Sequence, residues 1–210
     1  MSFPFAESLR NSLRTSLAAF AHEELAAPAT DLKHAAVAIT IVESAPGSGE
    51  AGFLLTRRAK TLRGHAGQWA LPGGRCDAGE SAIEAALREL HEELGLSLAA
   101  SDVLGTLDDY PTRSGYRITP VIAWAQDETA LLPNPAEVAS VHRIPVADVA
   151  HPDAVSFVSI AESERRVVRL RIADTHIHAP TAAILYQFGE LLSGRMTRVA
   201  DLEQPVFAWR

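Results

Sequence analysis

The sequence is poor in several features that define classes of protein. It has one cysteine, Cys76, among 210 residues, which excludes a disulfide framework and a zinc site built from cysteines. Its 13 glycines and 12 prolines exclude a collagen-like or low-complexity chain. Basic residues number 19 against 26 acidic ones, so the net charge is −7 and we expect no nucleic-acid partner.

The chain also lacks any segment long and apolar enough to cross a membrane. Charged residues interrupt the apolar residues near the N-terminus, so we expect no secretory signal there. Those apolar residues instead recur at the spacing of an amphipathic helix: Phe5, Leu9, Leu13, Leu17 and Phe20. We expect this helix to pack on the domain rather than on a membrane, and we expect the protein to be cytoplasmic.

The composition that is present, 47% hydrophobic and 21% charged residues, is that of one globular domain. Apolar runs between turn residues predict strands over 35–42, 52–56, 103–107, 116–124, 138–144, 155–160 and 167–172. Helical spacing predicts helices over 81–94 and 180–192. Because strands and helices mix without regular alternation, the fold class is predicted as α/β, with helices on the faces of a mixed sheet. We divide the chain into an N-terminal helical extension (1–33), the main domain (34–194) and a C-terminal tail (195–210).

The predicted helix 81–94 carries an unusual set of charges. Its apolar face is formed by Ile83, Leu87, Leu90 and Leu94. Glu89, Glu92 and Glu93 are predicted on the opposite side, within about 100° of arc. Each like-charge pair costs about 0.2–0.5 kcal/mol, and the helix dipole disfavours anions at this end. A hard divalent cation such as Mg²⁺ or Mn²⁺ would relieve this repulsion, although an acidic helix face alone is more often a solvated surface.

The residues around these glutamates make the metal interpretation more specific. Arg88 is four residues from both Glu84 and Glu92, so it can pair along the helix. Just upstream, Gly73 and Gly74 allow the backbone to approach a ligand closely.

Gly74, Glu80 and the run 88–96 match a longer pattern at every fixed position. The pattern is G-x5-E-x7-R-E-U-x-E-E-x-G-U, where U is aliphatic, and the segment therefore resembles the Nudix box. The resemblance implies an α/β/α sandwich with a mixed sheet. It also implies hydrolysis, dependent on Mg²⁺ or Mn²⁺, of a nucleoside diphosphate linked to another group. A homodimer is common for this fold and is expected by analogy alone.

The resemblance also implies a role for each matching residue. Glu89 and Glu93 resemble the main metal ligands, with Glu92 close behind, and these three are the catalytic candidates. In some family members the first of these glutamates, which corresponds to Glu89, acts as the base instead, so the division of roles is left open here. The remaining implied roles are a metal-ligating carbonyl at Gly73, and structural roles for Gly74 and for an ion pair of Glu80 with Arg88.

A basic loop precedes this segment. Residues 51–76 contain no acidic residue but include Arg57, Arg58, Lys60, Arg63, His65 and Arg75. Cations beside a metal-binding helix suit the outer phosphates of a polyphosphate ester, whereas the alternative is a solvated hairpin loop. The candidates for binding substrate phosphates are Arg58, Arg63 and Arg75.

Residues 54–74 are similar to a motif found before the box in coenzyme A pyrophosphatases, L-L-T-x-R-[SA]-x3-R-x3-G-x3-F-P-G-G. Leu71 stands where this motif has Phe, and His178-Ala179 stand where the subfamily has an aromatic residue and a glycine. The similarity implies cleavage of coenzyme A or acyl-CoA to 3′,5′-ADP and 4′-phosphopantetheine. The alternatives are another substrate, such as ADP-ribose, NADH or a nucleotide sugar, and a domain that senses a nucleotide without cleaving it. Further along the chain, residues 134–138 and 144–146 resemble another segment of the same subfamily. Glu137 in this segment is either a further acidic residue near the metals or a turn carboxylate.

Several other residues are given ordinary interpretations. His176 and His178 alternate along the chain but are interpreted as polar positions rather than metal ligands. Trp69, Trp124 and Trp209 are interpreted as packing residues, although Trp69 is close to the candidate site in sequence.

Overall fold

A computed structural model describes residues 2–22, 32–61, 67–126, 131–172, 175–205 and 207 of the chain. Its main sheet has the strand order β3-β2-β1-β7-β5, with β4 paired to β1, β6 to β7 and β8 to β2. These strands are β1 (Lys33–Glu43), β2 (Ala51–Arg58), β3 (Trp69–Ala70), β4 (Gly73–Arg75), β5 (Val103–Thr106), β6 (Tyr110–Pro111), β7 (Tyr116–Trp124) and β8 (Val138–Pro145). β1 and β7 are parallel and the other pairs are antiparallel, so the predicted mixed sheet is confirmed.

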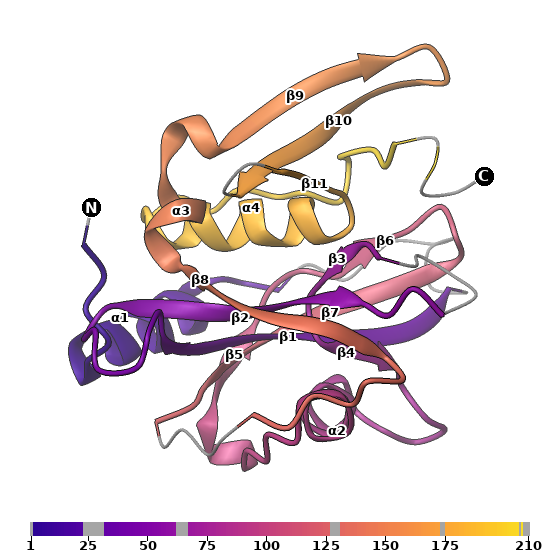
Figure 1. The fold of residues 1–210 in the computed structure, drawn as a ribbon. Coiled ribbons are helices and arrows are strands. Elements are labelled where there is room, and N and C mark those ends of the chain that lie inside the picture. Colours follow the sequence, from indigo (N-terminus) through magenta and orange to yellow (C-terminus); the bar gives the residue numbers. More distant parts are fainter. Residues whose placement is uncertain are drawn as a thin grey trace.

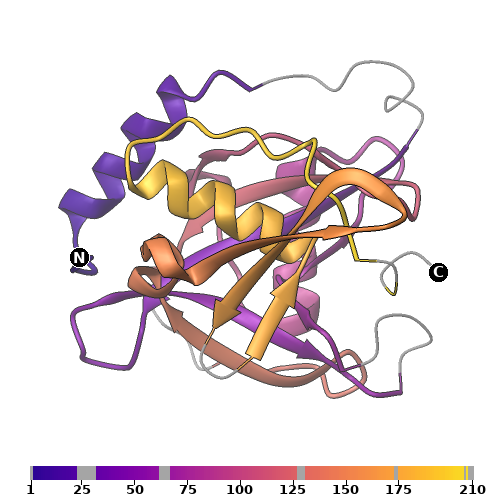
Figure 2. The ribbon, with the colours of Figure 1, turned by 90° about the horizontal axis from the view of Figure 1, so that it is seen from above.

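Helices cover both faces of this sheet (Figure 1). α2 (Ala82–Leu94) lies on one face and α4 (Thr181–Leu192) on the other, beside α1 (Glu7–Ala19) and the short α3 (Val146–Ala150). The α/β/α sandwich that the sequence indicates is therefore present. A second sheet of three strands, β9 (Val155–Ile160), β10 (Ser163–Ile172) and β11 (Thr175–His178), lies against the outer side of α4 (Figures 1 and 2). β9 and β10 pair in antiparallel and correspond to the predicted strands over 155–160 and 167–172, whereas β11 was not predicted.

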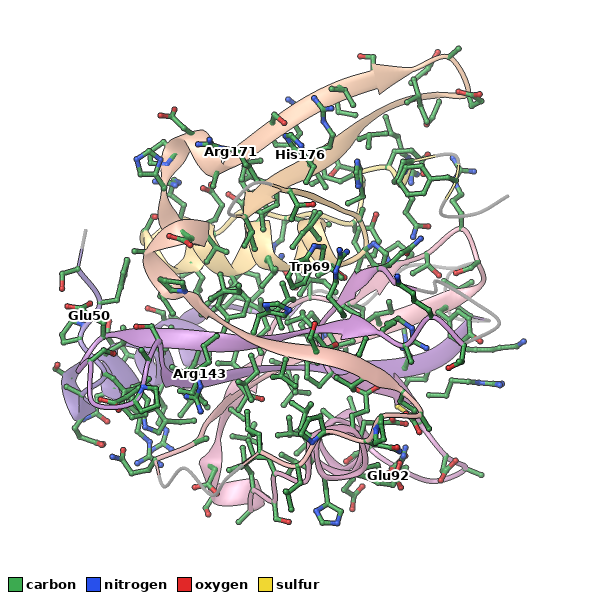
Figure 3. The ribbon with its side chains drawn as sticks, in the orientation of Figure 1. Glu50, Trp69, Glu92, Arg143, Arg171 and His176 are labelled. Atoms are coloured by element: carbon green, nitrogen blue, oxygen red, sulfur yellow. The ribbon has the colours of Figure 1, made fainter. Side chains whose placement is uncertain are left out.

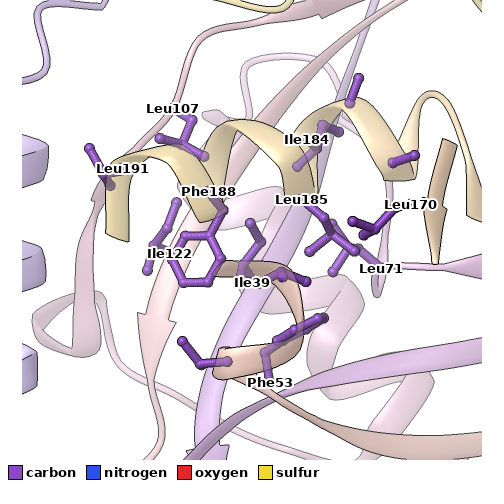
Figure 4. Close-up of a cluster of buried hydrophobic side chains, with 14 of the residues drawn as sticks. Ile39, Phe53, Leu71, Leu107, Ile122, Leu170, Ile184, Leu185, Phe188 and Leu191 are labelled. Carbon is purple, nitrogen blue, oxygen red and sulfur yellow. The ribbon is translucent and has the colours of Figure 1, made fainter. Parts of the chain in front are cut away.

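The central strand β1 shows why the core has two parts. Its side chains alternate between the faces of the sheet, so Ala36 and Ala38 pack on the α2 side and Ile39 and Ile41 pack on the α4 side. The larger of the two clusters lies under α4, where Phe188, Leu185 and Ile184 contact residues of the sheet (Figure 4). A strand that is apolar on both faces is explained by this burial between helices.

Segments at both ends of the described chain add to this larger cluster. Leu13 and Leu17 of α1 are buried in it, as the amphipathic spacing predicted. Val199 and Leu202, from the segment predicted as a tail, are buried in it as well. Residues 23–31 of the predicted N-terminal extension lie outside the described residues. Among the described residues, none of the helices combines the length and the apolar character needed to cross a membrane.

α4 approaches α3 closely at Gly189. A Cβ atom at this position would lie on the carbonyl oxygen of Val149 and 3.0 Å from its carbonyl carbon. We expect Gly189→Ala to lower the free energy of unfolding by about 1–3 kcal/mol, the usual cost of overpacking, although alanine alone favours a helix by about 1 kcal/mol. Urea unfolding measures the change, and a more stable variant would show that the two helices can separate here at little cost.

Candidate active site

The local sequence defines both ends of α2, the helix that carries the acidic residues. Ser81 caps its start: the Ser81 hydroxyl accepts from the Glu84 backbone N–H, and the Glu84 carboxylate accepts from the Ser81 backbone N–H at 2.9 Å. Gly95 ends the helix in the left-handed conformation, with φ 68°. The predicted helix is therefore confirmed at both boundaries.

The buried face of α2 differs from the predicted one. Ala85, Ala86, Leu90, Leu94 and also Glu93 are buried, whereas Leu87 is only partly buried. The interpretation that all three glutamates lie opposite the buried face is wrong for Glu93, which is 4% exposed. The small side chains of Ala85 and Ala86 allow this side of the helix to pack against the sheet. Glu93 is seven residues after Ala86 and lies on the same side, so it is buried as well.

Three carboxylates from two segments meet at this face. Glu89 and Glu93 of α2 and Glu137, from the turn before β8, each offer an oxygen atom within 4.8 Å of the others. Asn134 Nδ2 donates to Glu137 Oε1 at 3.4 Å, and the backbone carbonyl of Glu137 accepts from the Ala59 N–H. Of the two interpretations of Glu137, its position favours the acidic residue near the metals. A cluster of carboxylate oxygens is the donor set that Mg²⁺ and Mn²⁺ prefer.

The surroundings disfavour the negative charge of two of these carboxylates. Burial, followed by repulsion from Glu89, raises the pKa of Glu93 to about 7, while Arg58 and the backbone N–H of Gly73 oppose the rise. Burial also raises the pKa of Glu89, against the opposing effect of Arg88. Bringing these groups together therefore costs free energy in the metal-free protein, and a bound cation would reverse that cost.

Arg88 holds the loop, the helix and Glu89 together. Its Nε and Nη2 atoms donate to the two carboxylate oxygens of Glu80 at 2.8 and 3.0 Å, and Nη2 also donates to the Arg75 carbonyl. Its Nη1 atom donates to Glu89 Oε1 at 2.9 Å and to Glu92 Oε2 at 3.0 Å. The Glu92 side chain is 51% exposed and points to solvent (Figure 3), so the structure brings Glu137 to Glu89 and Glu93 and leaves Glu92 at the margin.

Gly73 and Gly74, where the box begins, are required by close approaches. A Cβ at Gly74 would overlap the carboxylate of Glu89, and a Cβ at Gly73 would overlap the Ala36 carbonyl on β1. Gly73 directs its backbone N–H toward Glu93. A metal-ligating role for the Gly73 carbonyl stays a prediction.

A cleft of ≈ 370 Å³ begins at these glycines and extends toward α4. Arg58 and Arg75, two of the three predicted phosphate-binding residues, line it. The Arg58 Nε atom is buried and has no hydrogen-bond partner among the described residues. The third candidate, Arg63, lies outside the described residues, as does His65.

The cleft also has walls that the sequence did not indicate. Thr112, Ser114 and Tyr116 come from the β6–β7 region, and Gln204 comes from the C-terminal segment. Gln204 Oε1 accepts from the Arg113 backbone N–H at 2.7 Å, which fixes that segment at the cleft. No local pattern marks these residues, because only the folded chain brings them near β4.

Both a family model and individual known proteins are similar to this chain. A family model described as NUDIX domain matches residues 32–161. The chain is 33% identical over 161 residues to an uncharacterized Nudix hydrolase, NudL, of Photorhabdus laumondii, and the match covers 75% of this chain and 84% of that protein. It is 39% identical over 120 residues to NudL of Escherichia coli K12, covering 57% of this chain and 60% of that protein.

Among solved structures, the chain is similar to a C. elegans Ap4A hydrolase in a binary complex. The TM-score is 0.49 at 19% identity, and the match covers 78% of this chain and 99% of that one. A Nudix hydrolase from M. smegmatis, RenU, matches with a TM-score of 0.46 at 31% identity, over 57% of this chain and 77% of that one.

Proposed function

The chain belongs to the NUDIX domain family, and from this premise we propose that it hydrolyses the diphosphate of coenzyme A or acyl-CoA. Family membership makes the protein a pyrophosphatase that acts on nucleoside diphosphate derivatives. The products of the proposed reaction are 3′,5′-ADP and (acyl-)4′-phosphopantetheine. A cytoplasmic location and a homodimer stay predictions.

The carboxylate cluster fits the divalent metal that Nudix hydrolases generally use. Glu89, Glu93 and Glu137 supply oxygen ligands from three side chains, and their mutual repulsion gives the site affinity for a cation. A bound Mg²⁺ or Mn²⁺ would neutralise the diphosphate and lower the pKa of a water molecule. The candidate ligand set is therefore these three residues. Glu92 lies at the margin of the cluster, where its carboxylate accepts a hydrogen bond from Arg88.

The other residues of the site position the reacting groups. The Glu80–Arg88 ion pair fixes one oxygen of Glu89, so this carboxylate keeps its orientation. Arg58 and Arg75 face the cleft and would bind the outer phosphate oxygens. Water adds to one phosphorus as the bridging P–O bond breaks, and a site carboxylate takes the proton of that water; either Glu89 or Glu93 is the candidate base.

One observation carries the choice of substrate: the cleft that Arg58 and Arg75 line also has apolar walls. Beyond Arg58 and Gly74 its walls include Val37, Leu71 and Ile184. Such walls suit the pantetheine arm, a flexible chain with alkyl and amide groups. The Leu71 departure from the motif keeps an apolar wall, since Leu71 is 4% exposed and belongs to the core.

Product analysis tests the proposal. The protein is incubated with coenzyme A, acetyl-CoA, ADP-ribose and NADH, each with Mg²⁺ and with Mn²⁺, and the products are identified by mass spectrometry. We expect phosphopantetheine and 3′,5′-ADP as the dominant pair. Faster cleavage of ADP-ribose or NADH would overturn the substrate assignment. Saturable binding without cleavage of any of the four would instead indicate a sensor.

Arg58→Gln is expected to raise KM for the cleaved substrate by about tenfold, because one charge-assisted hydrogen bond to a phosphate is lost. Steady-state kinetics measures the change. Arg171→Gln is the matched control, since Arg171 is exposed on β10 (Figure 3) and does not line the cleft. Equal KM values for the two variants would remove Arg58 from the binding site.

A further inference from the structure

A second cavity adjoins the cleft and is unused by the proposed hydrolysis. Its volume is ≈ 170 Å³, and it shares Gln68, Trp69, Pro180 and Thr181 with the cleft. Its other walls come from Arg57 of β2, residues 175–178 of β11, and Phe207. The cavity therefore lies where the main sheet, the small sheet and the C-terminal segment meet. Figure 3 shows Trp69 and His176 on two of these elements.

Planar groups form much of its lining. The Arg57 guanidinium lies over the Trp69 ring, 4.7 Å from the ring centroid, and Arg57 Nη1 donates to the Gly67 carbonyl at 2.9 Å. On another wall, His178 and Phe207 meet edge to face with their ring centroids 5.1 Å apart. Aromatic rings and guanidinium planes are the surfaces on which proteins stack nucleobases. The cleft shares Trp69 with this cavity, and its remaining walls are of mixed character, with Tyr116 beside aliphatic and polar side chains.

Two residues that line the cavity, Trp69 and His178, carry polar ring nitrogens. The Trp69 indole Nε1 is buried and has no hydrogen-bond partner among the described residues. An unpaired buried donor is costly, and a ligand acceptor would satisfy it. His178 is partly buried, and burial followed by the charges of Arg169 and His176 lowers its pKa. A neutral imidazole offers one donor and one acceptor.

We propose that this second cavity binds the nucleobase of the substrate, a purine, against Trp69, Arg57 and His178, while the cleft takes the group on the other side of the diphosphate. The alternation of side chains along β2 supports this division. Arg57 lines the second cavity and its neighbour Arg58 lines the cleft. One strand therefore places a cation beside each of the two parts of a diphosphate substrate. The inference rests on the hydrolysis of nucleoside diphosphate derivatives, but coenzyme A, ADP-ribose and NADH all carry adenine and satisfy it equally.

The inference assigns new roles to residues that the sequence left as ordinary. Trp69 becomes a binding residue instead of a packing residue only, and His178 becomes a determinant of base recognition. His178 also stands at one of the departures from the coenzyme A motif. Nothing in the local sequence indicates this role, because Trp69 and His178 are 109 positions apart.

Metal-free binding of AMP tests this inference, with ribose 5-phosphate as the probe that lacks a base. Isothermal titration calorimetry should show AMP binding at least about fivefold more tightly, since the lower end of the range for stacking one base corresponds to that factor. His178→Ala and Phe207→Ala should each weaken AMP binding by about fivefold or more without changing the affinity for ribose 5-phosphate. Trp69→Phe keeps a ring but removes the N–H group, and it should weaken AMP binding less than His178→Ala.

His151→Ala is the matched control, because His151 is exposed on the turn before β9 and lines neither cavity. AMP affinity that is unchanged in both His178→Ala and Phe207→Ala would overturn the inference, as would an equal loss for the two probes. The result is separate from the choice of substrate. Normal AMP discrimination with no cleavage of coenzyme A would contradict the proposed substrate and leave the base site intact.

Discussion

Glu93→Gln is expected to reduce kcat by roughly two to three orders of magnitude, the usual effect of removing one group that stabilises charge in a reaction. Glu93 is the most buried of the three clustered carboxylates, and both Glu89 and Glu137 lie near it. Glutamine keeps the shape of the side chain but cannot supply its negative charge. Steady-state turnover at saturating Mg²⁺ measures the loss.

The same substitution is not expected to destabilise the metal-free fold. The pKa of Glu93 is raised to about 7, so between its ordinary value of 4.5 and about 7 the folded state binds more protons than the unfolded state. The stability of the wild-type protein therefore falls as pH rises through that window. Glutamine lacks this dependence, so Glu93→Gln should gain stability relative to the wild type between pH 5 and pH 8. Thermal melts in EDTA at the two pH values measure the difference.

Glu84→Gln provides the control on the same helix. Glu84 caps the start of α2 and lies outside the carboxylate cluster, and glutamine can accept the same hydrogen bonds. Its turnover should stay close to that of the wild type. Near-normal turnover in Glu93→Gln would contradict the role of the cluster, whereas a loss in Glu84→Gln would point to a general effect on the helix.

Gly74→Ala is expected to lower kcat/KM by about 10- to 100-fold, because the new methyl group displaces the Glu89 carboxylate. The methyl carbon would overlap that carboxylate, which is the end of a side chain and can move aside. The fold should therefore remain intact while Glu89 loses its position against Arg88. Circular dichroism and kinetics together separate these two effects.

A double-mutant cycle shows whether Gly74 acts through Glu89. If it does, Gly74→Ala adds little further loss in a protein that already carries Glu89→Gln. Independent, multiplicative losses would mean that the glycine is needed for another reason, such as close approach of the substrate to the backbone.

The features that the sequence predicted best are those with local causes. Ser81 and Gly95 carry the chemistry of helix ends, so the boundaries of α2 follow from a few neighbouring residues. The apolar run in β1 likewise indicates a strand buried on both faces. The position of Glu89 follows from its place on this helix, and the resemblance to a known motif indicated the chemistry of Glu89 and Glu93.

Features that depend on distant contacts were not predicted. β1 pairs in parallel with β7, which is separated from it by more than 70 residues, and no local pattern specifies that partner. Glu137 joins the cluster only because β8 pairs with β2, so the sequence left two interpretations open. Glu93 is buried on the same side of the helix as Ala85 and Ala86, which a simple division into apolar and charged faces overlooks.

The account depends above all on Glu89, Glu93 and Glu137 forming one divalent-cation site. Titration of the protein with Mn²⁺, followed by the electron paramagnetic resonance signal of the free ion, tests this directly. We expect saturable binding in the wild type and in Glu84→Gln, and at least about tenfold weaker binding when any one of the three is changed to glutamine. Wild-type Mn²⁺ affinity in all three glutamine variants would contradict the account.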